Sequence, residues 1–144
     1  MYYFIKPQSA SQLGNKTVYD KSVVPWGIEK LHVIFDVWSN DDILKNSPCY
    51  FISKKLHNGI LDSELSGIEI GEQIQIDKSD TFQSLYPNKK IGEFYLVHIT
   101  GSPMVSDFGI LSPNKLIISE KALKLLNGYI MNDCEIVRHM PPTV

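Results

Sequence analysis

The chain has 144 residues, of which 43% are hydrophobic and 21% are charged, and its formal net charge is −2. This length and composition suit a single globular domain, residues 1–144, with a buried core. The weak charge argues against a nucleic-acid partner, because such binders usually carry clustered Lys and Arg. No segment reaches membrane-spanning length, and residues 1–7 lack the pattern of a secretory signal. We therefore expect a cytoplasmic protein that contacts no membrane and whose two cysteines are reduced.

The first third of the chain is expected to be mainly extended. Residues 2–5 predict an opening strand that ends at Pro7, where the missing amide stops further pairing. A polar loop is expected over residues 8–21. Alternating apolar residues predict a strand over 31–38. The polar residues that follow it then suit the start of a short helical turn at 43–45.

The middle of the chain predicts strands without a helix. Isoleucines of one parity between residues 68 and 76 indicate extended structure, and Gly71 marks a bend or bulge within it. Residues 77–80 are expected to form a loop. Residues 94–99 are almost continuously apolar, which is typical of a strand covered on both faces. A loop is then expected to lead to residue 116, and the tail from residue 140 contains two prolines that cannot continue a central strand.

An internal similarity is the most informative feature of the sequence. Residues 52–70 align with residues 118–136 at an offset of 66 without a gap, and five of the nineteen aligned positions are identical. In both copies an apolar stretch meets a serine, Ser53 or Ser119, that is a good N-cap for a following helix. The similarity predicts two strand–helix–strand units, at about 50–70 and 116–136. The alternative is that this arrangement is a common local solution without a shared origin.

Both predicted helices have an apolar face. The first carries Leu56 and Ile60, although Gly59 between them weakens it by roughly 1 kcal/mol. The second carries Ala122, Leu125, Leu126 and Tyr129 on one side. Because these helices are interleaved with many short strands, we expect an α+β fold. It would be a single domain with a mixed or mainly antiparallel sheet and two or three helices on one side.

The familiar catalytic and cofactor motifs are absent from the sequence. No glycine-rich phosphate loop, His-Glu-x-x-His or Cys-x-x-Cys occurs, and the four histidines have no ligand-like spacing. We therefore expect no metal, no cofactor and no catalytic residue. A nucleophilic pair could still be assembled by the fold, with Cys49 or Cys134 as thiolate and His32 or His98 as base.

One short segment has the composition of a recognition surface. Asp36, Trp38, Asp41 and Asp42 place an aromatic ring beside several carboxylates, as an interface anchor with a charged rim requires. The alternative is that Trp38 is a core residue and that Asp41 or Asp42 caps the next turn. Trp26 is a second aromatic that is either exposed or part of the core.

Several short motifs resemble a known family. They are Tyr2-Tyr3-Phe4, Asp42-Ile43-Leu44, the stretches 51–56 and 65–70, and residues 118–121. Together they resemble a bacterial family of immunity proteins encoded beside polymorphic toxins.

The resemblance implies a non-enzymatic cytoplasmic protein that blocks one cognate toxin domain delivered by contact, by type VI secretion or by an Rhs system. The matching residues are scaffold positions, so the resemblance assigns no binding residues. The other hypothesis is a small-ligand-binding domain or an enzyme whose site is assembled only in the fold.

Overall fold

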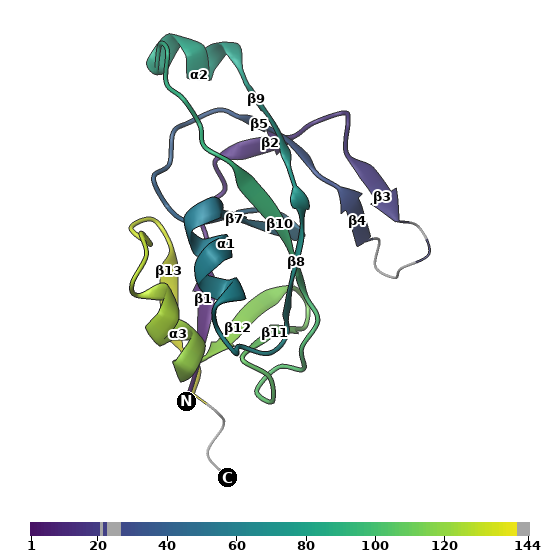
Figure 1. The fold of residues 1–144 in the computed structure, drawn as a ribbon, viewed down its shortest axis with the longest axis vertical. Helices are drawn as coiled ribbons and strands as arrows, with labels where there is room; N and C mark the ends of the chain where they lie inside the picture. Colours follow the sequence, from purple (N-terminus) through teal and green to yellow (C-terminus); the bar gives the residue numbers. More distant parts are fainter. Residues whose placement is uncertain (21, 23–26, 141–144) are drawn as a thin grey trace.

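The computed structural model describes residues 1–20, 22 and 27–140, and it has the expected α+β class with mainly antiparallel sheets (Figure 1). Two four-stranded sheets form most of the fold. The central sheet has the order β6 (Ile43–Asn46), β7 (Cys49–Ser53), β10 (Phe94–Ile99), β8 (Ile68–Gln73). The terminal sheet, which joins both ends of the chain, has the order β11 (Phe108–Leu111), β12 (Lys115–Ser119), β1 (Tyr2–Lys6), β13 (Glu135–Arg138).

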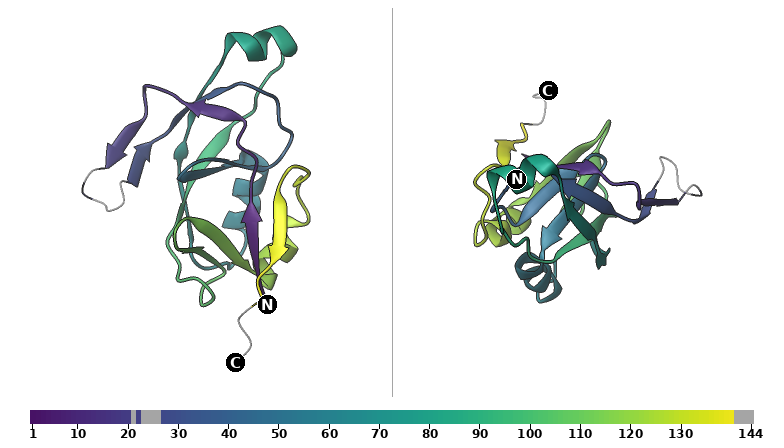
Figure 2. Two further views of the ribbon diagram at one scale, coloured as in Figure 1. Left: turned by 180° about the vertical axis from the view of Figure 1, so that it is seen from behind. Right: turned by 90° about the horizontal axis from the view of Figure 1, so that it is seen from above.

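A further layer covers one face of the central sheet. It contains the covering sheet, with the order β2 (Ser11–Leu13), β5 (His32–Phe35), β9 (Gln75–Lys78), and the helix α2 (Asp80–Leu85). The pairing of β5 with β9 is parallel, unlike that of the other named strands. A hairpin of β3 (Val18–Asp20) and β4 (Gly27–Lys30) projects from this layer, as the views from behind and from above both show (Figure 2).

The predicted repeat is present as two strand–helix–strand units. In the first, β7 leads into α1 (Lys54–Leu61) and then β8; in the second, β12 leads into α3 (Glu120–Leu126) and then β13. Each unit begins with a hairpin, β6–β7 or β11–β12, whose turn contains a Ser-Pro pair with a cis peptide bond. In each sheet one antiparallel strand lies between the two strands of the unit. That strand is β10 in the central sheet and β1 in the terminal sheet.

The strands β1 and β10 occupy equivalent places in the two sheets. Tyr95 pairs with Ile52 in the central sheet, and Tyr3 pairs with Ile118 in the terminal sheet. Their sequences also match in character, Phe-Tyr-Leu-Val for residues 94–97 and Tyr-Tyr-Phe-Ile for residues 2–5. The two halves are therefore related by an internal pseudo-symmetry in which the start of the chain completes the second half.

Both helices begin at the predicted serines. The Ser53 hydroxyl accepts a hydrogen bond from the Leu56 amide, and the Ser119 hydroxyl accepts one from the Ala122 amide. Each serine hydroxyl also donates to an aspartate that precedes its own hairpin. The distance is 2.6 Å from Ser53 to Asp42 and 2.6 Å from Ser119 to Asp107.

The same two aspartates connect the halves to each other. The second carboxylate oxygen of Asp42 accepts the Ile130 amide at 2.8 Å, from the segment that follows α3. The carboxylate of Asp107 accepts the Ser66 amide at 2.9 Å, from the segment that follows α1. Each aspartate thus joins the start of its own helix to the chain beyond the other helix. We call this pair of contacts the aspartate exchange.

Two hydrophobic cores lie on opposite faces of the central sheet. The first is enclosed by the inner faces of both large sheets together with α1 and α3, and Leu56, Ala122 and Leu126 are fully buried in it. The second lies between the central sheet and the covering layer, where Phe35, Phe51 and Phe82 are fully buried. The predicted helix faces are therefore correct, whereas α2 belongs to the second core and not to the side of the other two helices.

Gly59 has a packing role in α1 that the sequence pattern does not reveal. A Cβ atom built on Gly59 would lie 1.8 Å from the hydroxyl oxygen of Tyr129, which follows α3. The missing side chain therefore allows Tyr129 to lie against α1. This contact explains why a residue that lowers helix propensity occupies the middle of a helix.

Several sequence expectations are wrong in detail. Residues 43–45 belong to β6 rather than a helical turn, because they pair with β7. Residues 77–80 include the end of β9 and the start of α2, and the expected strand over 31–38 is limited to β5, with β4 preceding it. The expected loops also contain strands, namely β2 and β3 within 8–21 and β11 before residue 116. The bulge near Gly71 is confirmed by a register shift between β8 and β10.

Leu126→Ala is expected to lower the free energy of unfolding by about 2–5 kcal/mol, as for other fully buried leucines. Leu61→Ala is the control, because this leucine of α1 is 61% exposed and its loss should change stability by less than about 0.5 kcal/mol. Urea denaturation of both variants measures the difference. Equal stabilities of the two variants would contradict the assignment of α3 to the first core.

The aspartate exchange is expected to make the fold sensitive to acid. Burial, the largest influence, favours the protonated form of Asp107, but hydrogen bonds from Ser119 and Ser66 outweigh it and lower its pKa below the ordinary 3.8. A folded-state pKa below the unfolded value stabilises the fold above pH 3.8, and this contribution is lost as the pH falls through the lower folded pKa.

Asp107→Asn should therefore cost about 1–3 kcal/mol at pH 7 and progressively less below pH 4. Asp62→Asn is the matched control, since the described residues form no hydrogen bond with that exposed side chain. Denaturation curves of the wild type and both variants from pH 7 to pH 2 measure the effect. A cost for Asp107→Asn that does not change with pH would show that the carboxylate charge is not what stabilises the exchange.

Candidate functional site

The predicted recognition cluster does not form one surface, because Asp41 and Asp42 are buried. Asp42 belongs to the aspartate exchange, and Asp41 accepts the amides of Asn132 and Asp133, each at 2.9 Å. Burial raises the pKa of Asp41, partly opposed by these amide hydrogen bonds. The expectation that these two carboxylates form an exposed charged rim is therefore wrong. They bind backbone amides of the segment after α3, and neither caps a turn at residues 43–45.

Asp36 and Trp38 lie apart from those two residues, beside the second core. Both carboxylate oxygens of Asp36 accept hydrogen bonds from the Gln12 side chain, at 3.0 and 2.9 Å. Trp38 is half-buried against the second core, and the Lys89 ammonium lies 4.3 Å from its ring centroid. This placement of Trp38 is closer to the core alternative than to an exposed anchor. Trp26 lies outside the described residues.

The candidate thiol–imidazole pairs lack an activated thiol. Burial raises the pKa of Cys49 to about 11. The pKa of Cys134 is also raised to about 11, by burial and by the nearby Asp41 carboxylate. Cys49 and His98 both line one cleft of about 490 Å³, and no hydrogen bond joins them within the described structure. A nucleophilic cysteine needs a lowered pKa, which neither thiol has.

His32 has both ring nitrogens engaged. Its Nδ1 accepts the Lys16 amide at 3.2 Å, so its Nε2 carries the proton and donates to Asp77 at 2.6 Å. Gly14 lies directly against the imidazole, where a Cβ atom would come within 2.0 Å of Nδ1. His32 thus connects β5, the loop after β2 and β9, and it has no nitrogen available to a substrate.

The terminal sheet has an outer face that is partly uncovered. Pro103 packs against Gly109 on β11, which closes the part of this face over β11. The rest carries side chains of β1, β12 and β13, and we call them the open face: Phe4, Lys6, Lys115, Glu135 and Val137. Val137 is 51% exposed, and the Lys115 ammonium lies 5.5 Å from the Phe4 ring centroid.

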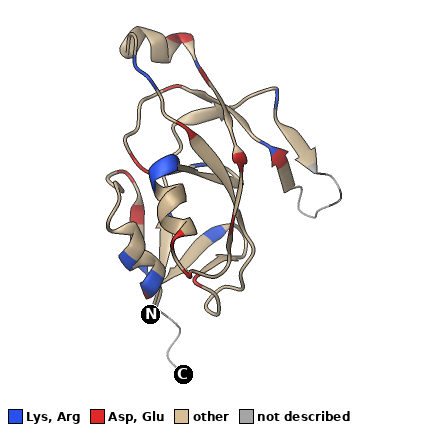
Figure 3. Cartoon of the chain, in the orientation of Figure 1, with Lys and Arg blue, Asp and Glu red and all other residues tan. Residues whose placement is uncertain are grey.

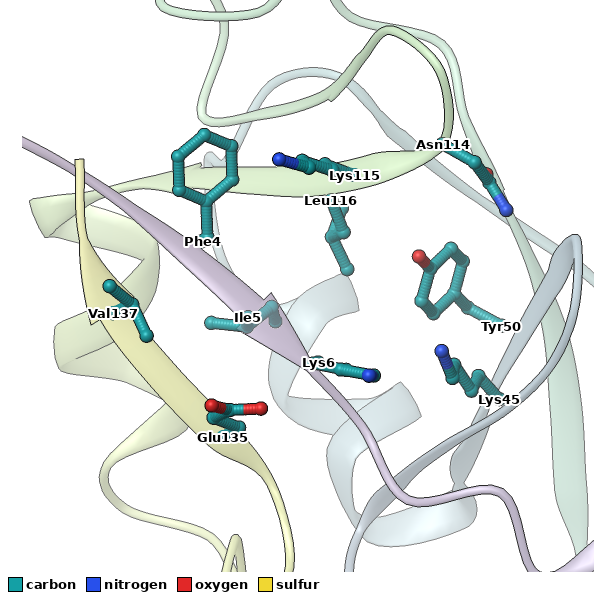
Figure 4. Close-up of a pocket in the computed structure, with 10 residues that line it drawn as sticks. All are labelled: Phe4, Ile5, Lys6, Lys45, Tyr50, Asn114, Lys115, Leu116, Glu135 and Val137. Atoms are coloured by element: carbon teal, nitrogen blue, oxygen red, sulfur yellow. The ribbon is translucent and has the colours of Figure 1, made fainter. Parts of the chain in front are cut away.

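A cleft of about 420 Å³ begins at the open face and extends to the β6–β7 hairpin (Figure 4). We call it the lysine cleft, because Lys6, Lys45 and Lys115 line it together with Glu135. Tyr50, from the first core, reaches it with its hydroxyl, and Ile5 and Leu116 supply apolar surface. None of the three lysines takes part in an ion pair within the described structure.

This concentration of positive charge contrasts with the rest of the molecule. The whole chain has a formal net charge of −2, and acidic and basic residues are otherwise scattered over the ribbon (Figure 3). The cleft has three lysines and one glutamate, so its local charge has the opposite sign. A cleft with apolar surface and unpaired cations is suited to bind an anionic group carried by an apolar body.

Sequence reasoning missed the open face and the lysine cleft. The equivalence of β1 and β10 was a usable signal, because it predicts that Phe4 points to the same side of its sheet as Leu96. Leu96 is covered more completely than Phe4 because the covering layer lies over the central sheet only. This layer is not part of either strand–helix–strand unit, so the repeat does not predict it. The convergence of Lys6, Lys45 and Tyr50 also depends on the tertiary fold alone.

Comparisons with protein-family models, with curated proteins and with solved structures found no match to this chain. Among the described residues, no group of three or more His, Cys, Asp or Glu side chains is placed to hold a metal ion. The helices within the described ranges are all too short or too polar to cross a bilayer. The resemblance to immunity proteins therefore stays a prediction from the sequence.

The two thiols are expected to react slowly at neutral pH. With pKa values of about 11, only on the order of one molecule in ten thousand carries either thiolate at pH 7. Alkylation of the Cys49→Ser and Cys134→Ala variants by iodoacetamide isolates one thiol at a time, and each rate should rise with pH up to about 11. A rate at pH 7 equal to that of free cysteine would revive the nucleophile hypothesis.

Proposed function

We propose that this protein is a bacterial immunity protein that binds a cognate toxin domain in the cytoplasm and neutralises it without catalysis of its own. The toxin domain binds to the open face. In the complex the immunity protein blocks the active site of the toxin or the access of its substrate. The assignment to immunity is supported by the sequence resemblance. The location of the interface is supported by a separate observation, the difference between the two pseudo-symmetric halves.

That difference is the observation that carries the proposal. In the central sheet the outward side chains of β7 and β10, among them Phe51 and Leu96, are buried under the covering layer. The equivalent strands of the terminal sheet are β12 and β1. There Ile117, the counterpart of Phe51, is also fully buried, but Phe4 remains half-buried and Lys115 is exposed. One half therefore closes its outer face within the chain, and the other half leaves part of its outer face for a partner.

The composition of the open face fits a protein partner. Phe4 and Val137 offer apolar contact at its middle, and lysines surround them. Interfaces commonly combine an apolar centre with a polar rim, and charged rims accelerate encounter with a partner of opposite charge. The expected partner surface is therefore apolar and acidic.

A second function, the binding of a small ligand, is favoured by the volume of the lysine cleft. About 420 Å³ lies within the range of small-molecule sites. The two functions differ in which residues matter. A small ligand inside the cleft depends on its interior, whereas a docked protein depends on exposed residues such as Val137.

Val137→Arg is the sharpest test of the proposed interface. A large charged side chain at the centre should weaken binding of the toxin domain, encoded by the adjacent reading frame, by about a hundredfold or more. The fold should be unaffected, because Val137 is 51% exposed. Calorimetric titration measures the affinity, and survival of cells that express the toxin measures protection.

Leu85→Arg is the matched control, an equally drastic change at a 58% exposed leucine of α2 on another part of the surface. It should leave both affinity and protection unchanged. Unchanged affinity of Val137→Arg would remove the open face from the interface. No binding of the wild type to the toxin domain would reject the immunity function itself.

A further inference from the structure

Tyr50 is a buried residue whose hydroxyl opens on the lysine cleft. Only 6% of this residue is exposed, yet its hydroxyl has no hydrogen-bond partner within the described structure. The ring packs in the first core, and the hydroxyl lies at the inner end of the lysine cleft (Figure 4). A hydroxyl that opens on a cleft without a partner in the protein is free to donate a hydrogen bond to a group that enters the cleft.

Two ammonium groups extend toward the same space. Lys6, on β1, and Lys45, on β6, reach the cleft from different sheets (Figure 4). Lys115 is held over the Phe4 ring at the rim, so Lys6 and Lys45 are the cations available inside. Burial raises the pKa of Tyr50, with a smaller contribution from Cys134, and its hydroxyl therefore remains a proton donor at neutral pH. The two ammonium groups can only donate, and the hydroxyl can donate beside them.

We propose that the lysine cleft binds a carboxylate, held by the ammonium groups of Lys6 and Lys45 and by the hydroxyl of Tyr50. Two ammonium groups and one hydroxyl provide charge-assisted hydrogen bonds to both carboxylate oxygens. A carboxylate carried on a hydrocarbon stem also suits the apolar surface of Ile5 and Leu116 beside these groups.

The surroundings favour a carboxylate over a phosphate. Phosphate sites are usually built from arginine forks or from backbone amides at helix N-termini and turns. No arginine and no helix N-terminus lines the lysine cleft, and Asn114 is its only turn residue.

The source of the carboxylate rests on the proposed function. In the complex we assign it to an Asp or Glu side chain of the toxin domain, inserted beside the apolar contact at Phe4 and Val137. Truncating such a buried charge contact typically slows association little and speeds dissociation. The site itself is a property of the free protein and is testable without the toxin.

The first experiment titrates the isolated protein with glutarate and, separately, with inorganic phosphate, and follows backbone amides by NMR. Glutarate should give saturable shifts confined to β1, β6 and β7, and should bind more tightly than phosphate. Lys6→Gln and Lys45→Gln should each weaken glutarate binding about tenfold, and raising the salt concentration should weaken it further. Tyr50→Phe should weaken it by a smaller factor.

Lys30→Gln on β4 is the matched control, because this lysine is exposed and does not line the cleft. It should leave the glutarate affinity unchanged. Lys6 is exposed, so its replacement keeps the test valid even where Tyr50→Phe alters the core. Absence of saturable shifts in the wild type would overturn the site. Equal or tighter binding of phosphate would overturn its assignment to a carboxylate.

The second experiment measures the affinity of the toxin domain for the same variants. A parallel loss in Lys6→Gln and Lys45→Gln supports an acidic side chain of the toxin as the occupant. Unchanged toxin affinity in variants that have lost glutarate binding would overturn that source and leave a site for a free carboxylic acid. Toxin binding by a wild type that binds no glutarate would overturn the site while the proposed function stands.

Discussion

The fold depends on the aspartate exchange between its two halves. The carboxylate of Asp42 receives the Ser53 hydroxyl and the Ile130 amide, and that of Asp107 receives the Ser119 hydroxyl and the Ser66 amide. A carboxylate with two hydrogen bonds is well satisfied in the interior, whereas removing it leaves a hydroxyl and an amide without a partner. Because each aspartate fixes the start of one helix and the chain after the other, neither half is complete alone.

Pseudo-symmetry explains the division of tasks between the two sheets. Both sheets contribute inner faces to the first core, where Ile52 and Ile118 occupy equivalent places and both are fully buried. Only the central sheet receives the covering layer, built from the chain between β1 and β6 and between β8 and β10. Over β1 and β13, the outer face of the terminal sheet is therefore not covered by another layer of the fold. Its residues are available for binding at little cost to the stability of the fold.

Local sequence signals predicted the two helix starts of the repeat correctly. Ser53 and Ser119 identified both helix starts because N-capping depends on a few neighbouring amides. The similarity was found only from residue 52 onward because the β11–β12 turn is one residue longer than the β6–β7 turn, which hides Asp42 and Asp107 from an ungapped alignment. The predicted recognition cluster was wrong for a related reason. Carboxylates close to a tryptophan in the sequence suggest the charged rim of an interface. The burial of Asp41 and Asp42, however, depends on a segment about ninety residues away, which contacts them through Ile130 and Asn132.

The chain uses its charges in two physically different ways. Asp41, Asp42 and Asp107 each bind groups of the chain itself, so their free energy of interaction is already contained in the fold. Lys6 and Lys45 form no ion pair in the described structure, and the Tyr50 hydroxyl in the same cleft has no hydrogen-bond partner there. Their interaction free energy becomes available only when an anion arrives. Aspartates with hydrogen-bond partners near the helix starts therefore stabilise the fold, and the donors around the lysine cleft are the groups on which the proposed binding site depends.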